Sequence, residues 1–296
     1  MLLNKVRTFL DPSQIYRNFS KTNVKLLFRH FSKGTIDSGA VMSSNPQHKP
    51  QGHLSSSGKE VTVKRLSVEG NIAVGKSTFL RLLSSSYPGW SLMEEPLKKW
   101  QHVSSSSNQD MDNLLQLLYD NPARWSYTFQ TLSCMGRFKS QVAPFSEQLL
   151  KQLEPVQIFE RSVYSDKFVF AKTLHELGHF NDIEWTLYQD WHMFLLQQFG
   201  DRAALDGILY LRASPEKCFE RLEKRARKEE KTVTLDYLEK LHKQHENWLA
   251  AKSPDTHFEY IRHIPVLMLD VNENFEDNPM FIKEHINKVK EFVASL

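Results

Sequence analysis

The sequence predicts an α/β fold, in which a parallel β-sheet is covered by helices on both faces. Two observations support this fold class. From Val61 onward, short apolar runs alternate with longer stretches whose apolar residues recur every three or four positions. A glycine-rich turn joins the first apolar run to the first helical stretch. Strand–helix alternation of this kind is typical of a parallel sheet.

Five apolar runs are the candidate strands, at residues 64–70, 90–95, 155–161, 207–213 and 265–271. Candidate helices lie between them, among others at residues 111–119, 126–138, 185–199 and 215–228. In parallel sheets, ligands bind at the carboxyl ends of the strands. The residues that follow each strand are therefore the first candidates for chemistry.

The glycine-rich turn, GNIAVGKST, fits the pattern G-x-x-x-x-G-K-[ST] of a phosphate-binding loop. Its glycines let backbone N–H groups point inward at anionic oxygens. Lys76 adds a charge for the β- and γ-phosphates, and Ser77 offers a hydroxyl to Mg²⁺. A glycine turn that binds no phosphate is the alternative. We expect the loop to bind a nucleoside triphosphate through Gly70, Asn71, Ile72, Ala73, Val74, Gly75, Lys76, Ser77 and Thr78.

Two glutamates stand where chemistry is expected. Glu95 follows the second candidate strand, and Glu160 ends the third, directly before Arg161. Phosphate transfer to a hydroxyl needs an acceptor for the hydroxyl proton and positive charge around the moving phosphate. Either glutamate can supply the first, while Mg²⁺, Lys76 and Arg161 supply the second. Solvated surface acids are the alternative interpretation.

An arginine-rich stretch, RLEKRARKEEK at residues 221–231, is a candidate lid. Arg221 and Arg225 are four residues apart, so their guanidinium groups share a helix face. A charged, solvated helix explains this pattern equally well when it is taken alone. Beside a phosphate loop, such a segment can also close over the triphosphate and neutralise charge in the transition state.

Composition and charge exclude several other classes of protein. A net charge of +3 over 296 residues gives no reason to expect a nucleic-acid partner. No apolar run approaches the roughly 18 residues of a membrane span. The cysteines, Cys134 and Cys218, rule out a disulfide framework, and the scattered histidines indicate no zinc site.

The N-terminal segment has the composition of an organelle transit peptide. Before Asp37 it carries seven lysines and arginines and a single acid, Asp11, interleaved with leucine, phenylalanine and serine. A solvated basic tail is the alternative. We expect residues 1–42 to be the transit peptide, residues 43–60 a disordered linker and residues 61–296 the folded domain. Translation from Met42 would give a cytosolic form without the basic segment.

Seven motifs occur in the order found in the deoxyribonucleoside kinases: GNIAVGKST, EPLKKW, RWSYTFQT, ERSVYSDKFVFA, YQDWH, RARKEEK and LDVNENF. From residue 64 onward the chain resembles this family, and most of all its mitochondrial members that phosphorylate deoxyguanosine. The resemblance implies a phosphate-loop kinase fold with a five-stranded parallel sheet, a homodimer and a place in the mitochondrial matrix. It also implies, with Mg²⁺, phosphate transfer from ATP or UTP to the 5′-hydroxyl of a deoxynucleoside.

The same resemblance implies roles for individual residues. Glu95 matches the acid nearest the 5′-hydroxyl, and Glu160 and Arg161 match the catalytic centre beside Lys76 and the metal, which Ser77 and Glu160 would hold. Base recognition falls on Gln130, Arg137 and Asp166, the sugar 3′-hydroxyl on Tyr119 and Glu230, and the apolar walls on Trp100, Phe129 and Phe170. The lid matches Arg225, Ala226 and Arg227, and the loop at the donor base matches Glu273, Asn274 and Phe275. Without the resemblance, Phe129 and Phe170 would be interpreted as core residues.

Arg137 is the basis for a prediction of base selectivity. The helix expected at residues 126–138 presents Gln130, Ser133 and Arg137 on one side. A guanidinium can donate to both O6 and N7 of guanine, and Asp166 would balance its charge. We expect deoxyguanosine first, deoxyadenosine and deoxycytidine behind it, and thymidine excluded. The alternatives are an enzyme of broad specificity that favours deoxycytidine, a GTP-dependent switch and an inactive nucleotide-binding module.

Overall fold

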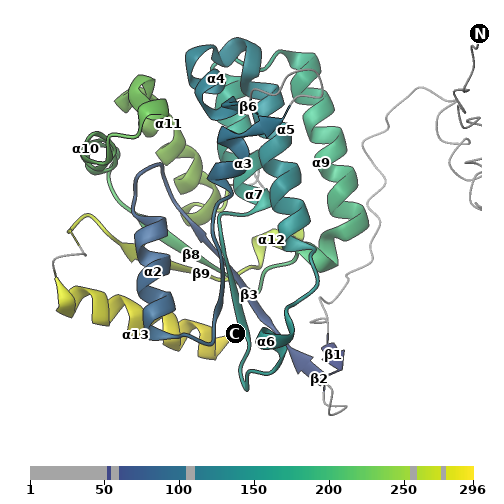
Figure 1. Ribbon diagram of the computed structural model, residues 1–296, viewed down its shortest axis with the longest axis vertical. Helices are drawn as coiled ribbons and strands as arrows, with labels where there is room; N and C mark the ends of the chain where they lie inside the picture. The colour runs from purple at the N-terminus through teal and green to yellow at the C-terminus, as the bar shows by residue number, and fades with distance from the viewer. Residues whose placement is uncertain (1–51, 55–59, 105–110, 254–258, 275–277) are drawn as a thin grey trace, which may run out of the picture. The chain divides into compact units, whose positions relative to one another are not determined.

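The structure, a computed structural model, describes residues 52–54, 60–104, 111–253, 259–274 and 278–296 (Figure 1). All of these residues belong to one unit, His48–Leu296. The expected transit peptide (residues 1–42), most of the expected linker and Phe275 lie outside the described residues. Their assignments stay predictions.

The central feature is a five-stranded parallel sheet in the order β4-β7-β3-β8-β9. Strand β3 lies in the middle, where Val68 pairs with Glu160 of β7 on one side and Leu209 of β8 on the other. These three strands are buried along almost their whole length, as apolar parallel strands covered on both faces should be. The predicted strands are all confirmed, with bounds β3 Lys64–Glu69, β4 Ser91–Met93, β7 Val156–Glu160, β8 Gly207–Arg212 and β9 Val266–Asp270.

Helices cover both faces of this sheet, as predicted (Figure 1). Helices α2 (Lys76–Ser86) and α13 (Pro279–Ser295) pack together on one side, and α5 (Pro122–Gln141) and α9 (Asp182–Ala203) pack together on the other. Both α5 and α9 begin before their predicted starts, because Asn121 and Asn181 cap their first turns. The remaining helices are α3 (Leu97–Gln101), α4 (Leu114–Asp120), α6 (Glu147–Leu150), α7 (Val163–Ser165), α8 (Lys172–Glu176), α10 (Pro215–Arg225), α11 (Leu235–His245) and α12 (Glu259–Arg262), with the π-helices η2 (Asp166–Ala171) and η4 (Glu246–Ala250) and the 3-10 helix η3 (Lys228–Thr232).

Two other predicted helices are shorter in the structure than expected. The helix expected at residues 111–119 starts only at Leu114, because Asn113 caps it and β6 (Met111–Asp112) pairs with β5 (Val103–Ser104) instead. The helix expected to reach residue 228 stops at Arg225, because Ala226 adopts a left-handed conformation with φ of 51°. The chain then continues as η3, so the arginine-rich segment is a helix end, a turn and a short helix.

Part of the expected linker forms a short hairpin. Strand β1 (Gly52–Leu54) pairs with β2 (Glu60–Thr62), and His53 lies opposite Val61. The β-branched residues of β2 favour such extended pairing over disorder. Disorder is therefore a wrong prediction for residues 52–54 and 60.

The core has two parts. The larger surrounds the sheet, and its fully buried members include Leu66, Ile158 and Leu209. The smaller joins α3, α4 and α5 through Trp100, Leu114, Leu115, Leu118 and Phe129. The smaller cluster holds three helices together beside the carboxyl end of the sheet.

Candidate active site

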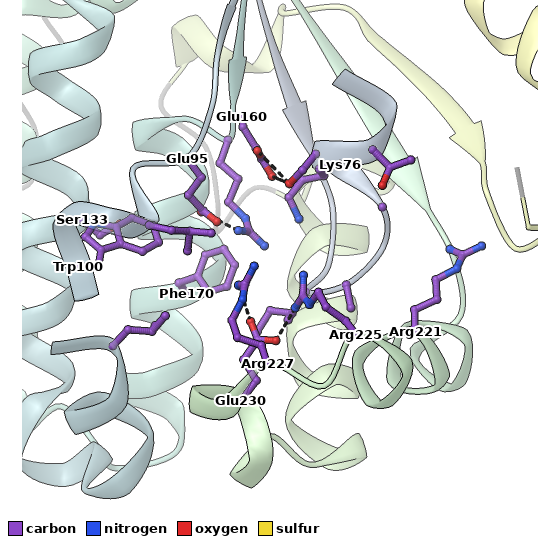
Figure 2. A pocket seen from close by; sticks show the side chains of 18 of the residues that line it. Lys76, Glu95, Trp100, Ser133, Glu160, Phe170, Arg221, Arg225, Arg227 and Glu230 are labelled. Carbon is purple, nitrogen blue, oxygen red and sulfur yellow. Dashed lines mark hydrogen bonds and ion pairs between the residues drawn. The ribbon is translucent and has the colours of Figure 1, made fainter. Parts of the chain in front are cut away.

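A cavity of about 510 Å³ lies at the carboxyl ends of β3, β4 and β7 (Figure 2). The first residues of α2 line one side of it, and residues of α3, α4 and α5 line the other. Residues that follow α10 lie across from the loop before α2. In open parallel sheets, ligands bind beyond the carboxyl ends of the strands, at the point where the strand order reverses. The volume of the cavity suits a small molecule.

The phosphate loop curls between β3 and α2 as the glycine pattern predicts. Gly70 and Gly75 have φ values of 143° and 110°, which favour glycine. A Cβ at Gly70 would lie 2.5 Å from the carbonyl oxygen of Leu211, so a side chain there would clash. The Lys76 ammonium donates to the carbonyl oxygens of Gly70 (3.2 Å) and Asn71 (2.8 Å). Burial lowers the pKa of Lys76 to about 7, so an anionic ligand would favour its charged form.

Ser77 and Glu160 bring a hydroxyl and a carboxylate together beside the loop. Ser77 Oγ donates to Glu160 Oε1 (2.9 Å) and Oε2 (3.2 Å). Oxygen ligands of these two kinds suit Mg²⁺. Among the described residues, no three His, Cys, Asp or Glu side chains converge to hold a metal. The pair therefore fits a Mg²⁺ ion that takes its other ligands from phosphates and water.

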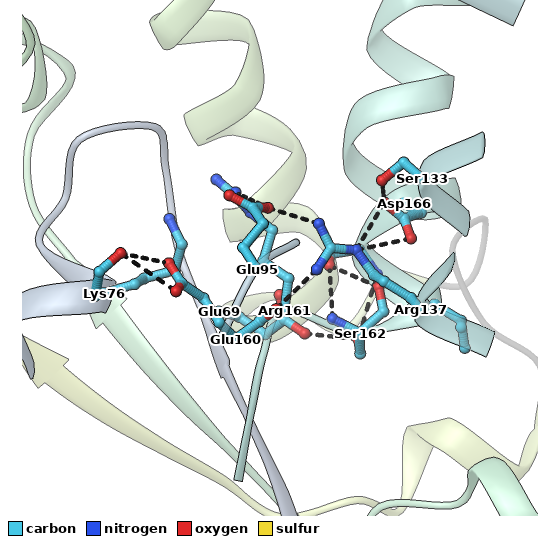
Figure 3. Close-up of polar contacts among 12 residues, drawn as sticks. Glu69, Lys76, Glu95, Ser133, Arg137, Glu160, Arg161, Ser162 and Asp166 are labelled. Atoms are coloured by element: carbon cyan, nitrogen blue, oxygen red, sulfur yellow. Dashed lines mark hydrogen bonds and ion pairs between the residues drawn. The ribbon is translucent and has the colours of Figure 1, made fainter. Parts of the chain in front are cut away.

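Glu95 lies between two guanidinium groups (Figure 3). Its Oε1 accepts from Arg137 Nη2 (2.6 Å) and from Arg161 Nη1 (2.8 Å). The neighbouring Glu94 is exposed, so Glu95 is the acid of this pair that faces the cavity. Burial alone would raise the pKa of Glu95, but the charges of Arg161 and Arg137 outweigh burial and hold this pKa well below its usual range. Glu95 is therefore an anion at neutral pH.

Arg137 is the centre of a buried ionic network (Figure 3). Besides Glu95, it binds Asp166 through Nε (2.9 Å) and the carbonyl oxygen of Glu160 through Nη1 (2.7 Å). Asp166 also accepts from Ser133 Oγ at 3.1 Å. Burial would lower the pKa of Arg137, but Asp166 and Glu95 raise it above its usual value. The pairing with Asp166 expected from the sequence is present, yet three of the five guanidinium N–H groups already bind protein, and the other two donate to no residue in the described part of the chain.

Aromatic side chains line the other half of the cavity. Trp100 and Phe129 meet edge to face with ring centroids 5.2 Å apart. The Arg161 guanidinium lies 4.6 Å from the centre of the Phe170 ring. Gln130 is buried among the lining residues, and its Oε1 has no hydrogen-bond partner in the described part of the chain. Apolar walls with a few unsatisfied polar groups suit a flat heterocycle.

The arginine-rich segment faces the phosphate loop across the cavity (Figure 2). Arg225 Nη2 and Arg227 Nη1 bind the two carboxylate oxygens of Glu230, at 2.5 and 2.9 Å. Glu230 is buried, while both arginines are partly exposed. Positive charge is thus held at the mouth of the cavity, where a phosphate group would meet it.

Most of the predicted site residues line the cavity, and a few lie outside it. The lining members are Ile72, Ala73, Gly75, Lys76, Ser77, Thr78, Glu95, Trp100, Tyr119, Phe129, Gln130, Arg137, Glu160, Arg161, Asp166, Phe170, Arg225, Arg227, Glu230 and Asn274. Gly70, Asn71, Val74, Ala226 and Glu273 are not among its lining residues. Four of these five support the site through their backbone carbonyls: Lys76 donates to those of Gly70 and Asn71, and Arg221 donates to those of Val74 and Glu273.

Glu69 is a buried acid that the sequence analysis missed. It ends β3, and its Oε1 accepts a 2.6 Å hydrogen bond from Ser162 Oγ. Arg161, next to Ser162, has a left-handed φ of 64° and donates its backbone N–H to Val68. These bonds hold the turn that presents Glu160 and Arg161. The rule that selected Glu95, an acid at the carboxyl end of a strand, applies equally to Glu69 and would have found it.

A phosphate loop at the centre of a parallel sheet, beside a cavity with acids and arginines, defines a phosphate-loop kinase. The family model "Deoxynucleoside kinase" matches residues 66–294. The chain belongs to the deoxynucleoside kinase family, and the family and enzyme class expected from the motifs are confirmed. Within the described residues, no helix is long and apolar enough to span a bilayer.

The chain is similar to relatives that are named for different substrates. The chain is 64% identical over 248 residues to the mitochondrial deoxyguanosine kinase of Xenopus laevis, an alignment that covers 81% of this chain and 94% of that protein. It is 47% identical to deoxycytidine kinase 2 of Gallus gallus, with 79% and 91% covered. It is 43% identical to the deoxycytidine kinase of Homo sapiens, with 82% and 96% covered.

Proposed function

We propose that the chain phosphorylates purine deoxynucleosides at the 5′-hydroxyl, deoxyguanosine before deoxyadenosine. The observation that carries this proposal is the charge-balanced Arg137 in the cavity, with two N–H groups left for acceptors. O6 and N7 of guanine are two such acceptors. The name of the frog relative, a deoxyguanosine kinase at 64% identity, supports the same base. The second candidate is a deoxycytidine-preferring enzyme, because the Gln130 amide can also pair with cytosine and other relatives are named deoxycytidine kinases.

Glu95 accepts the proton of the 5′-hydroxyl while the 5′-oxygen of the nucleoside attacks the γ-phosphorus of the donor. The arginines that lower the pKa of Glu95 also make it a weak base. A weak base suffices, because the loose transition state of phosphoryl transfer places its charge mainly on the phosphoryl oxygens. Arg161, bound to the same carboxylate, stabilises that charge. Glu160 is the alternative base, although its contact with Ser77 favours a role beside the metal.

The donor triphosphate lies between the phosphate loop and the arginine-rich segment. Lys76 and the loop N–H groups bind its β- and γ-phosphates, and Arg225 and Arg227 close over them. Mg²⁺ held by Ser77 and Glu160 would neutralise phosphate charge. ATP is the proposed donor and UTP the alternative, with Asn274 beside the donor base. The products are the nucleoside diphosphate and a deoxynucleoside 5′-monophosphate.

The proposed enzyme is a homodimer that joins through α9. Ile183, Leu187 and Phe194 lie on one face of this helix and are 74%, 51% and 57% exposed. An apolar stripe of this kind is typical of a helix that packs against a partner. Light scattering should show a dimer for the wild type and a monomer for Leu187→Glu with Phe194→Glu. A dimeric double variant would contradict this interface.

Residues 1–42 direct the proposed enzyme to the mitochondrial matrix. The basic, acid-poor composition of this segment and the name of the frog relative support this location. A fluorescent protein fused behind residues 1–42 should enter mitochondria, whereas a fusion to the chain starting at Met42 should stay in the cytosol. A diffuse cytosolic signal from the first fusion would contradict the proposal.

A substrate panel tests the proposed activity. The purified chain is incubated with each of the four deoxynucleosides and with either ATP or UTP, and 5′-monophosphate is measured. We expect the highest kcat/KM for deoxyguanosine with ATP and none above background for thymidine. Donor consumption that does not depend on a deoxynucleoside would contradict the proposed reaction.

A further inference from the structure

The arginine-rich segment is hydrogen-bonded to the acceptor side of the cavity through Glu229 of η3. The Glu229 side chain is buried, and its Oε1 accepts from Gln101 Nε2 (2.7 Å) and Asn113 Nδ2 (3.0 Å). Gln101 ends α3, and Asn113 caps α4. At the other end of η3, Thr232 Oγ1 donates to the carbonyl oxygen of Tyr119 in α4 at 3.3 Å. Helix η3 is therefore fastened to both ends of α4.

These contacts connect the lining residues of α3 and α4, where the nucleoside would bind, with the arginines that would bind the donor phosphates. Helices α3 and α4 form the acceptor wall, since Trp100 and Tyr119 line the aromatic half of the cavity and Trp100 packs on Phe129. Directly after Glu229, Glu230 binds Arg225 and Arg227, which face the phosphate loop. The hydrogen bond from Asn113 lowers the pKa of Glu229, so its carboxylate accepts both amides as an anion.

We propose that Glu229 is a positioning residue that couples acceptor binding to donor binding. A nucleoside that packs against α3 and α4 restricts the motion of these helices. Because Glu229 is hydrogen-bonded to both, the motion of η3 is restricted as well. Arg225 and Arg227 are then held where the donor phosphates bind. This inference rests on the proposed function. Because coupling is reciprocal, the donor must raise the affinity for the nucleoside by the same factor.

Calorimetry of donor binding measures this coupling directly. The full chain is titrated with the non-hydrolysable β,γ-imido analogue of ATP, without and with saturating deoxyguanosine. For the wild type we expect deoxyguanosine to lower the Kd of the analogue about tenfold, within the usual range of coupling. For Glu229→Ala we expect deoxyguanosine to change the Kd of the analogue by no more than about twofold. Glu229→Gln keeps one acceptor oxygen and should lie between the two.

A matched control removes the same charge from the same segment. Glu223 is exposed on α10, and Glu223→Ala should keep the wild-type ratio. The proposal is overturned if Glu229→Ala keeps that ratio or if the wild-type ratio is near one. If Glu229→Ala does not fold, Gln101→Ala removes one of the two amide donors to Glu229 and must lower the coupling ratio toward one. A wild type that binds neither ligand would instead contradict the proposed function.

Discussion

Removing Arg137 alone should destabilise the protein more than removing it together with Asp166. The side chains of Arg137 and Asp166 are 6% and 2% exposed, and they bind at 2.9 Å. Arg137→Met leaves Asp166 as a buried charge without its partner, while Glu95 keeps Arg161. Loss of one member of a buried pair costs about 3–5 kcal/mol, whereas loss of both is often nearly neutral. We therefore expect Arg137→Met to lower the free energy of unfolding by about 3–5 kcal/mol and the double variant with Asp166→Ala to recover most of it.

The assay is urea unfolding followed by circular dichroism, together with thermal melting. For a domain of this size, 1 kcal/mol corresponds to about 2–4 °C, so Arg137→Met should melt roughly 10 °C below the wild type. Asp166→Ala alone should cost less, because Glu95 still balances Arg137. In kinetics, Arg137→Met should lose about ten- to a hundredfold in kcat/KM for deoxyguanosine. A double variant less stable than Arg137→Met, or one that keeps full deoxyguanosine preference, would refute this reasoning.

Three further predictions concern Glu95, two buried histidines and Lys76. Glu95→Gln should fold but lose about 10²–10⁴-fold in kcat, as expected for a positioned base; near-normal kcat would move that role to Glu160. Burial lowers the pKa of His192 and of His245 to about 3. The pKa of histidine in the unfolded chain is near 6.5, so the unfolded chain takes up protons first as the pH drops. The free energy of unfolding therefore falls between about pH 6.5 and pH 3, by about 1.4 kcal/mol per pH unit for each histidine. Between pH 6.5 and pH 5, the free energy of unfolding measured with urea should fall by about 2 kcal/mol less for His245→Gln than for the wild type. An equal fall in both proteins would contradict the prediction. The pKa of Lys76 near 7 should rise when a triphosphate binds, so donor binding takes up a proton above pH 7 and weakens as pH rises further. Calorimetry in two buffers of different ionisation enthalpy should detect this uptake in the wild type and not in Lys76→Arg; no uptake in the wild type would contradict it.

The parts of the fold set by local sequence were predictable. The five strands are short apolar runs, and the phosphate loop depends on glycines whose φ values only glycine adopts readily. Helix ends were less predictable. The periodic pattern runs through Met111 and Lys228, but a cap at Asn113 and a left-handed residue at Ala226 end the helices earlier.

Most residues that line the cavity were candidates from the sequence, whereas most of their contacts were not predicted. Glu95 and Arg137 were both candidates, but nothing in the spacing shows that one carboxylate binds Arg137 and Arg161 together. Glu229 gives no signal at all, because its partners lie 116 and 128 residues away and meet it only when η3 packs on α4. Contacts of this kind follow from tertiary packing and not from local pattern.

A crystal structure with deoxyguanosine and the β,γ-imido analogue of ATP tests the assignment of the site most directly. We predict that the 5′-oxygen lies within hydrogen-bond reach of Glu95, about 2.6–3.2 Å. The guanine edge should face Arg137 and Gln130, and the γ-phosphate should lie between Lys76 and Arg161. A 5′-oxygen bound to Glu160 instead of Glu95, or a guanine turned away from Arg137, would contradict the assignment.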